Sequence, residues 1–274
     1  MNINFTLLDE SNFEKFENVL PPAFENSDNR ICLGAYEDSG SILGAVSYQL
    51  INYEYIIEWL YVDQEFRRNG VGMGLINEVI RTIISTGDIY PVSAKFEYSD
   101  SDSAMHTFFL SCKQMITEYS HDRYHVTSGD IKNSAALHKG VTQDVKTEYF
   151  FDRPVDEQKQ ILSKLSIEGI YSVHDYETFK KECVQELCRC VFVKNNLVDL
   201  IIMQKLPSGN LELSYLYGKY PQGLFKLLSL TVSDMERLFP DVTLFFEAVN
   251  EESKQLADRI FPKAEKVHIY EASF

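Results

Sequence analysis

The chain has 274 residues, with 41 acidic and 26 basic side chains and a formal net charge of −15. Apolar residues make up 45% and charged residues 24%, a balance typical of folded globular proteins rather than disordered chains. Such acidity excludes the broad basic face that binds duplex DNA or anionic lipid, so we predict neither nucleic acid nor a membrane as a partner.

Location and metal content follow from the N-terminus and the cysteines. The first five residues lack the basic start and apolar stretch of a secretion signal. The cysteines are odd in number and scattered, which disfavours a disulfide framework, and their spacing around residues 183–190 with His174 lacks the paired knuckles of a zinc site. They are Cys32, Cys112, Cys183, Cys188 and Cys190. We expect a cytoplasmic protein without a bound metal.

The first half alternates strand and helix patterns. Aromatic and β-branched residues favour the strand at 55–62, and an apolar stripe at helical spacing follows it. The predicted elements are a strand at 3–8, a helix at 9–20, strands at 30–36, 41–51 and 55–62, a helix at 71–87, a strand at 90–98, a helix at 104–115 and a strand at 124–127.

The second half repeats this order of elements. It is predicted as a helix at 154–165, strands at 189–193, 197–205 and 211–217, a helix at 223–239, a strand at 242–248, a helix at 251–260 and a strand at 266–271. Trp59-Leu60-Tyr61 aligns with Tyr215-Leu216-Tyr217, and Lys95-Phe96-Glu97 aligns with Phe245-Phe246-Glu247. We predict an internal duplication with domains at 1–145 and 146–274.

The chemistry is concentrated in residues 60–75, where a strand ends, a basic and glycine-rich turn follows, and a helix begins. A helix N-terminus has unpaired N–H groups and partial positive charge, which favour an anion. Glycines let a phosphate approach, and arginines add forked charged donors. These residues are Arg67, Arg68, Gly70, Gly72 and Gly74. A turn that needs glycine only for tight packing is the alternative, but it does not explain the arginine pair.

The spacing Arg67-x-x-Gly70-x-Gly72, between a strand ending in Leu60-x-Val62 and an apolar helix, resembles the pyrophosphate-binding motif of the GNAT N-acetyltransferase superfamily. The resemblance covers about residues 3–128. It implies an α/β (α+β) fold with two tandem GNAT-like domains, each a mixed twisted sheet flanked by helices. The fourth and fifth strands of the first domain would splay apart to admit acetyl-CoA.

The resemblance also implies which residues hold acetyl-CoA. Backbone groups of the strand would pair with the pantetheine arm, and the backbone near Tyr61 would form an oxyanion hole. The turn and its two arginine side chains would hold the pyrophosphate. The implied cofactor-binding residues are Leu60, Tyr61, Val62, Arg67, Arg68, Asn69, Gly70, Val71, Gly72, Met73 and Gly74.

Acyl transfer to an amine needs a base, because a free alkylammonium has a pKa of about 10.4. We predict Glu58, two residues before Leu60, for this role; the alternative is a solvent-facing glutamate. Glu97 and Asp100 are weaker candidates. The tyrosine that many relatives use as the acid falls here on Phe108 or Phe109, so its hydroxyl is absent. His106 is a candidate substitute, or otherwise a histidine on the helix surface.

The second half resembles a degenerate copy. Its corresponding turn has one glycine before the helix, no arginine pair, and Pro221, which lacks an N–H donor. We predict that it binds no acetyl-CoA and helps to wall the acceptor pocket. The predicted function is transfer of an acetyl group from acetyl-CoA to a primary amine of a small molecule, by direct attack on the thioester. A non-catalytic CoA-binding or interaction module of the same fold, and an acyltransferase using a longer acyl-CoA, remain open alternatives.

Overall fold

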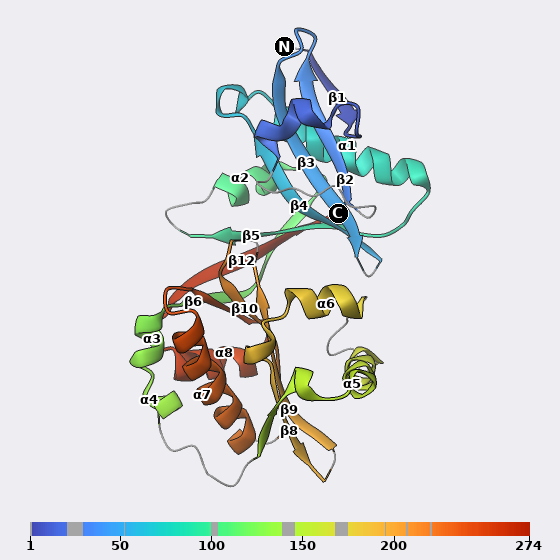
Figure 1. Cartoon of the computed structure of the whole chain (residues 1–274). Coiled ribbons are helices and arrows are strands. Elements are labelled where there is room, and N and C mark those ends of the chain that lie inside the picture. Colours follow the sequence, from blue (N-terminus) through green and yellow to red (C-terminus); the bar gives the residue numbers. More distant parts are fainter. Residues whose placement is uncertain are drawn as a thin grey trace. The chain divides into compact units, whose positions relative to one another are not determined.

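The computed structural model describes residues 2–20, 30–51, 53–99, 104–138, 146–167, 175–194, 196–206, 208–219 and 221–274. The chain forms two compact units. The first comprises residues 1–120 together with 269–274, and the second comprises residues 121–268. The chain is drawn in Figure 1.

A mixed sheet forms the centre of the first unit. Its main strands are β1 (Ile3–Leu7), β2 (Arg30–Glu37), β3 (Ile42–Ile51), β4 (Glu54–Val62) and β5 (Val92–Tyr98). They lie in this order, and only the β4–β5 pair is parallel. The strands after β5 are β12 (Glu265–Ser273) and β6 (Ile116–Val126), of which residues 269–273 and 116–120 belong to this unit.

Helices cover both faces of this sheet. Helix α1 (Val71–Thr86) packs against β1 to β4 and buries its apolar stripe almost completely, as predicted. The 3-10 helix η1 (Phe13–Val19) packs on the opposite face, where α-helix was predicted from residue 9. The shorter helices are η2 (Gln64–Phe66) and α2 (Ala104–Ser111). Burial of each large apolar side chain of α1 stabilises the fold by about 1.5–3 kcal/mol. Because α1 is held firmly on the sheet, the position of the turn that precedes it is also fixed.

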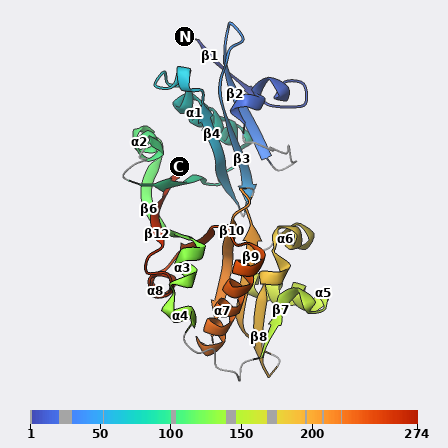
Figure 2. The same ribbon diagram turned by 60° about the vertical axis from the view of Figure 1, so that its left-hand side comes forward.

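The second unit has the same plan. Its strands are β7 (Thr147–Tyr149), β8 (Arg189–Val193), β9 (Asn196–Lys205), β10 (Leu211–Gly218) and β11 (Leu244–Ala248), followed by the second part of β6 and the first part of β12. Strands β10 and β11 pair in parallel, whereas the β7–β8, β8–β9, β9–β10 and β11–β6 pairs are antiparallel. Figure 2 shows α7 (Pro221–Leu238) along β8 to β10, and α8 (Glu251–Ile260) packs on β11.

Among the remaining helices of this unit, α5 (Val155–Ile167) confirms the helix predicted at 154–165, and the others are short and were not predicted. These others are α3 (Ser128–Lys132), α4 (Ala135–His138), η3 (Phe150–Asp152), α6 (Tyr176–Glu182) and η4 (Gln185–Leu187). Among the described helices of the chain, none combines the length and the hydropathy needed to cross a bilayer.

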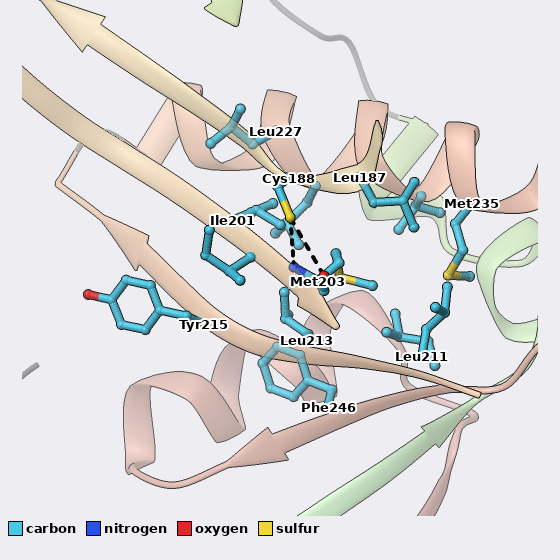
Figure 3. Close-up of a cluster of buried hydrophobic side chains, with 14 of the residues drawn as sticks. Leu187, Cys188, Ile201, Met203, Leu211, Leu213, Tyr215, Leu227, Met235 and Phe246 are labelled. Carbon is cyan, nitrogen blue, oxygen red and sulfur yellow. Dashed lines mark hydrogen bonds between the residues drawn. The ribbon is translucent and has the colours of Figure 1, made fainter. Parts of the chain in front are cut away.

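The cysteines of the second unit belong to its core, and Figure 3 shows Cys188 among the apolar side chains. The thiol of Cys188 donates to the Val184 carbonyl at 3.4 Å and lies 3.6 Å from that of Met203. Burial raises the pKa of Cys190 to about 12, so this thiol stays protonated at neutral pH. Within the described ranges, no group of three His, Cys, Asp or Glu side chains is arranged to hold a metal. His174 lies outside those ranges.

Strand pairing supports the duplication. In β4 the register against β3 slips so that Glu58 is an extra, bulged residue, and in β10 the register against β9 slips at Ser214. Each bulge precedes one of the aligned triplets that begin at Trp59 and Tyr215. The Trp59 and Tyr61 rings stack with centroids 6.3 Å apart, and the equivalent Tyr215 and Tyr217 rings stack at 6.4 Å.

The second local alignment is wrong by two residues. Val92 pairs with Tyr55 in the first unit, and Leu244 pairs with Leu211 in the second. Because Tyr55 corresponds to Leu211, Lys95 corresponds to Glu247 rather than to Phe245. The charge of this position therefore changes sign between the two copies.

The compact units divide the chain differently from the duplicated sequence. Strand β6 begins in the first unit and ends in the second, and β12 does the reverse. The division at 145/146 describes where one copy of the sequence would end and the next begin. The last strand of each copy, β6 or β12, instead has residues in both compact units. The short strand predicted at 124–127 is the end of the 11-residue strand β6.

Candidate functional site

Strands β4 and β5 separate soon after they meet. They pair only at Tyr55 with Val92 and at Ile56 with Ser93, although β4 continues to Val62 and β5 to Tyr98. The bulge at Glu58 follows directly, and a bulge bends its strand and increases its twist. The first unit therefore has the predicted opening between its fourth and fifth strands.

The open edge of β4 presents the backbone of alternate residues. The Asp63 N–H donates to the Leu43 carbonyl of β3 at 2.9 Å, which makes this a hydrogen-bonded pair. In an antiparallel ladder such pairs alternate, so the backbone of Tyr61 also faces β3. The N–H and C=O groups of Leu60 and Val62 then face away from β3, and the Val62 C=O already accepts from the Arg67 side chain. Leu60 is therefore a better candidate than Tyr61 for an oxyanion-hole donor.

The turn after β4 has an unusual backbone. Arg68 has φ +66°, in the left-handed region that non-glycine residues rarely adopt, and Gly70 has φ +83° as the N-cap of α1. Gly74 makes the first intrahelical bond, to the Gly70 carbonyl at 2.9 Å. The amides of Val71, Gly72 and Met73 come before that bond, so they point along the helix axis toward the turn.

The three glycines have different roles. A Cβ on Gly70 would meet nothing within 4 Å, so this residue faces open space at the helix N-terminus. A Cβ on Gly72 would lie 3.1 Å from the Phe108 ring, and one on Gly74 would lie 2.5 Å from the Phe5 ring. Gly74 is therefore required for packing of α1 on β1, and the prediction that all three glycines clear a path for phosphate fits Gly70 best.

The two arginines are also distinct. The Arg67 Nε donates to the Val62 carbonyl at 3.0 Å, and its guanidinium lies over the Tyr61 ring at 5.7 Å. Lys219 lies over Tyr217 at 5.3 Å in the second unit, a further sign of duplication. Arg68 is exposed beside the helix N-terminus.

The backbone of Arg68 makes a measurable prediction. A left-handed φ costs a non-glycine residue about 1 kcal/mol. The free energy of unfolding of Arg68→Gly should therefore exceed that of Arg68→Ala by about 1 kcal/mol, and Arg68→Gly should unfold at a higher denaturant concentration. Both variants lack the guanidinium and should lose acetyl-CoA affinity equally. Equal stability of the two variants would show that the turn relaxes to ordinary φ without cost.

Glu58 occupies the bulge beside the opening, on the η1 face of the sheet. Its Oε2 accepts from the Arg30 Nε at 2.6 Å, and its Oε1 accepts from the Gln49 side-chain amide. The Glu58 and Arg30 side chains are each 27% exposed. Neither Arg30 nor Gln49 was among the predicted site residues. The hairpin register could have indicated them, since it brings the start of β2 and the end of β3 beside the middle of β4.

A thiol nucleophile is disfavoured near Glu58. Cys32 lies within electrostatic range of Arg30 and Glu58, and burial raises its pKa to about 12 despite the opposing effect of Arg30. Burial likewise raises the pKa of Cys112 to about 11. Both thiols are neutral at pH 7, and a thiol attacks only as its thiolate.

Comparison with known families decides the assignment. Residues 3–108 match the model of the acetyltransferase (GNAT) family. Residues 3–108 therefore form a domain of the GNAT family. Its class is therefore acyltransferase, and the opening and the turn are those of a GNAT domain. A search with the sequence among curated proteins found no match.

Solved structures share the GNAT fold over the whole chain. A tandem GNAT protein from the clavulanic acid biosynthesis pathway is 13% identical with a TM-score of 0.67, covering 99% of this chain and 98% of its own. A GCN5-related N-acetyltransferase from Sphaerobacter thermophilus is 12% identical with a TM-score of 0.60, covering 96% and 84%. The similarity shows the fold, with two GNAT-like units in tandem.

The two residues at the position expected for an acid tyrosine, Phe108 and Phe109, lie on α2. Phe109 is fully buried, whereas Phe108 lies beside Gly72 at the start of α1. Phe108 is thus the residue beside the opening, and it has no hydroxyl. His106 packs against the Tyr270 and Tyr98 rings, with centroids 4.5 and 5.0 Å away, and so belongs to an aromatic cluster.

The weaker base candidates are placed as follows. Glu97 is exposed on β5, on the face that Ser93 and Lys95 share. Asp100 lies outside the described residues. Glu58 is therefore the carboxylate for which the structure shows a defined setting beside the opening.

The second unit has a charged cluster around Glu247, the residue that corresponds to Lys95 in the duplicated sequence. Glu247 accepts from the Arg123 Nε at 3.1 Å, and its other oxygen lies 3.3 Å from the His121 Nε2. Burial would raise the pKa of Glu247, but His121 and Arg123 outweigh it and lower the pKa to about 2. Burial, and then the nearby Glu247, raise the pKa of Glu212.

Glu247 should make stability depend on acidity. A carboxyl group whose pKa falls from 4.5 when unfolded to about 2 when folded stabilises the fold above pH 4.5 and loses that effect as the pH falls toward 2. The effect is about 2–3 kcal/mol. Thermal unfolding between pH 6 and 3 should therefore show a smaller decrease in Tm for Glu247→Gln than for the wild type. Parallel curves would contradict the assignment.

Proposed function

We propose that the first unit transfers an acetyl group from acetyl-CoA to the primary amine of a small molecule. The observation that carries the proposal is the separation of β4 from β5 next to a turn that carries the exposed Arg68 and ends at the N-terminus of α1. The residues fit the cosubstrate, because Gly70 faces open space where a diphosphate can approach the amides of residues 71–73. Acetyl-CoA would supply an activated acetyl thioester.

The residues of the chain then divide the remaining tasks. The open-edge backbone of Leu60 and Val62 would hold the extended pantetheine arm, with the Leu60 N–H placed to stabilise an oxyanion. Glu58 would take the proton that the acceptor ammonium loses, either directly or through water. The amine nitrogen would attack the carbonyl carbon, and the carbon–sulfur bond would break with release of CoA. The neutral state of Cys32 and Cys112 supports direct transfer without an acetyl-cysteine.

The second unit would bind no cosubstrate. Between β4 and α1 the chain has residues 63–70, which hold the arginines and Gly70, whereas only residues 219 and 220 separate β10 from α7. The second copy therefore retains the bulge and the strand opening but has lost the anion-binding loop. This supports the role of a degenerate partner domain.

Titration calorimetry tests binding. Acetyl-CoA should bind with a stoichiometry of one per chain, and release of CoA thiol should then be measured against a panel of small amines. Turnover with any amine favours an enzyme over a non-catalytic CoA-binding module. Propionyl-CoA and longer acyl-CoA compared under the same conditions test acyl length. Absence of acetyl-CoA binding by the wild type would overturn the proposal.

A further inference from the structure

Glu58 forms an ion pair with Arg30 beside the opening. The Arg30 Nε and the Glu58 Oε2 are 2.6 Å apart, and Gln49 donates to the second carboxylate oxygen. Arg30, Gln49 and Glu58 come from three adjacent strands, so the pair is fixed by the sheet. About a quarter of each charged side chain is exposed, which lets a small solute reach both.

Among the described strand residues, further charges on this face include Glu54 at the start of β4, and Lys95 and Glu97 on β5. Lys95 is 57% exposed and lies 3.8 Å from Glu271, and Glu97 is exposed beyond it. Among the described residues, Arg30 and Glu58 form the ion pair at the bulge itself, where the strands separate. It combines a forked donor that matches a carboxylate with an acceptor that matches an ammonium.

We infer that the acceptor carries a carboxylate next to its amine, as an α-amino acid does, and that Arg30 is the residue that selects it. The inference rests on the proposed function. A simple ammonium approaching Glu58 would compete with Arg30 for one carboxylate, leaving two cations side by side. A zwitterion brings a carboxylate to Arg30 and an ammonium to Glu58, so opposite charges alternate through the complex. A guanidinium carries five N–H donors and can be shared between two carboxylates.

Kinetics with matched acceptors test the inference. Initial rates of CoA release are measured for the natural L-α-amino acids and for their primary carboxamides, which keep the amine and side chain but lack the charge of the carboxylate. For wild type, we expect kcat/KM for the best acids to exceed that of their carboxamides at least tenfold. Arg30→Gln should reduce this ratio at least tenfold, mainly through KM, because the ratio within each enzyme cancels differences in amine basicity.

Control variants separate this role from a structural one. Lys95→Gln removes a cation from the same face and should leave the ratio unchanged, and Arg30→Lys should retain part of the preference. Arg30→Gln should bind acetyl-CoA with wild-type affinity, which shows that the fold is intact.

The outcomes are distinguishable. Carboxamides used as well as acids, a ratio unaffected by Arg30→Gln, or turnover confined to amines without a carboxylate would overturn the inference and leave the proposed function standing. Acetyl-CoA binding without turnover of any amino acid would also overturn it. Absence of acetyl-CoA binding would refute the proposed function itself.

Discussion

Replacement of Gly70 by aspartate is expected to weaken acetyl-CoA binding by about 100-fold. The Cα of Gly70 faces open space at the N-terminus of α1, so an added carboxylate would occupy the region proposed for the diphosphate. Two unit charges about 4 Å apart repel by about 4 kcal/mol at the effective dielectric of a protein surface, before screening by salt. The protein should remain folded, because aspartate tolerates a left-handed backbone and its charge is favourable at a helix N-terminus.

Gly70→Asn is the matched control. Asparagine has the same shape and the same tolerance for φ +83°, but it carries no charge. It should weaken binding much less than aspartate, and the difference between the two dissociation constants from titration calorimetry isolates the electrostatic effect. Added salt should reduce that difference. Similar affinities for both variants would place the diphosphate away from this helix end.

The turn and its flanking elements could be predicted because their signals are local. The apolar stripe of α1, the β-rich run before it and the arginine–glycine spacing are all contained within about 30 residues, and the helix found at Val71–Thr86 agrees with the prediction. The separate roles of the glycines could not be predicted. Gly74 faces Phe5 of β1. These two residues are far apart in the sequence, so no local pattern indicates their contact.

Longer-range pairing explains the other differences. The end of β12 belongs to the first unit because β12 lies next to β5 in the sheet. There, the Phe274 N–H donates to the Val92 carbonyl at 2.9 Å. Such register is set by contacts between residues far apart in the sequence. Most of β6 could not be predicted because residues 116–123 are too polar to resemble a buried strand. Charged side chains also occur in the part of β6 that pairs with β11.

Glu58→Gln should lower kcat/KM for the acceptor by about 100- to 1,000-fold at saturating acetyl-CoA, the usual contribution of a general base. The substitution keeps the size of the side chain and an oxygen that can accept from Arg30. Gln49 can present its own carbonyl oxygen to the new amide, so the bulge should remain intact. The affinity for acetyl-CoA should not change, because Glu58 lies at the start of the opening and the proposed diphosphate site lies beyond its far end, after Val62.

The pH dependence distinguishes a base from a structural residue. An alkylammonium has a pKa of about 10.4, so raising the pH from 7 to 9 increases the neutral amine about 100-fold and reduces the need for a base. The deficit of Glu58→Gln should therefore shrink as the pH rises. Glu54→Gln, a matched change at the start of the same strand, should show wild-type rates throughout. A deficit that stays constant with pH, together with normal acetyl-CoA binding, would mean that Glu58 holds the acceptor in place through its charge, and that the proton leaves directly to solvent.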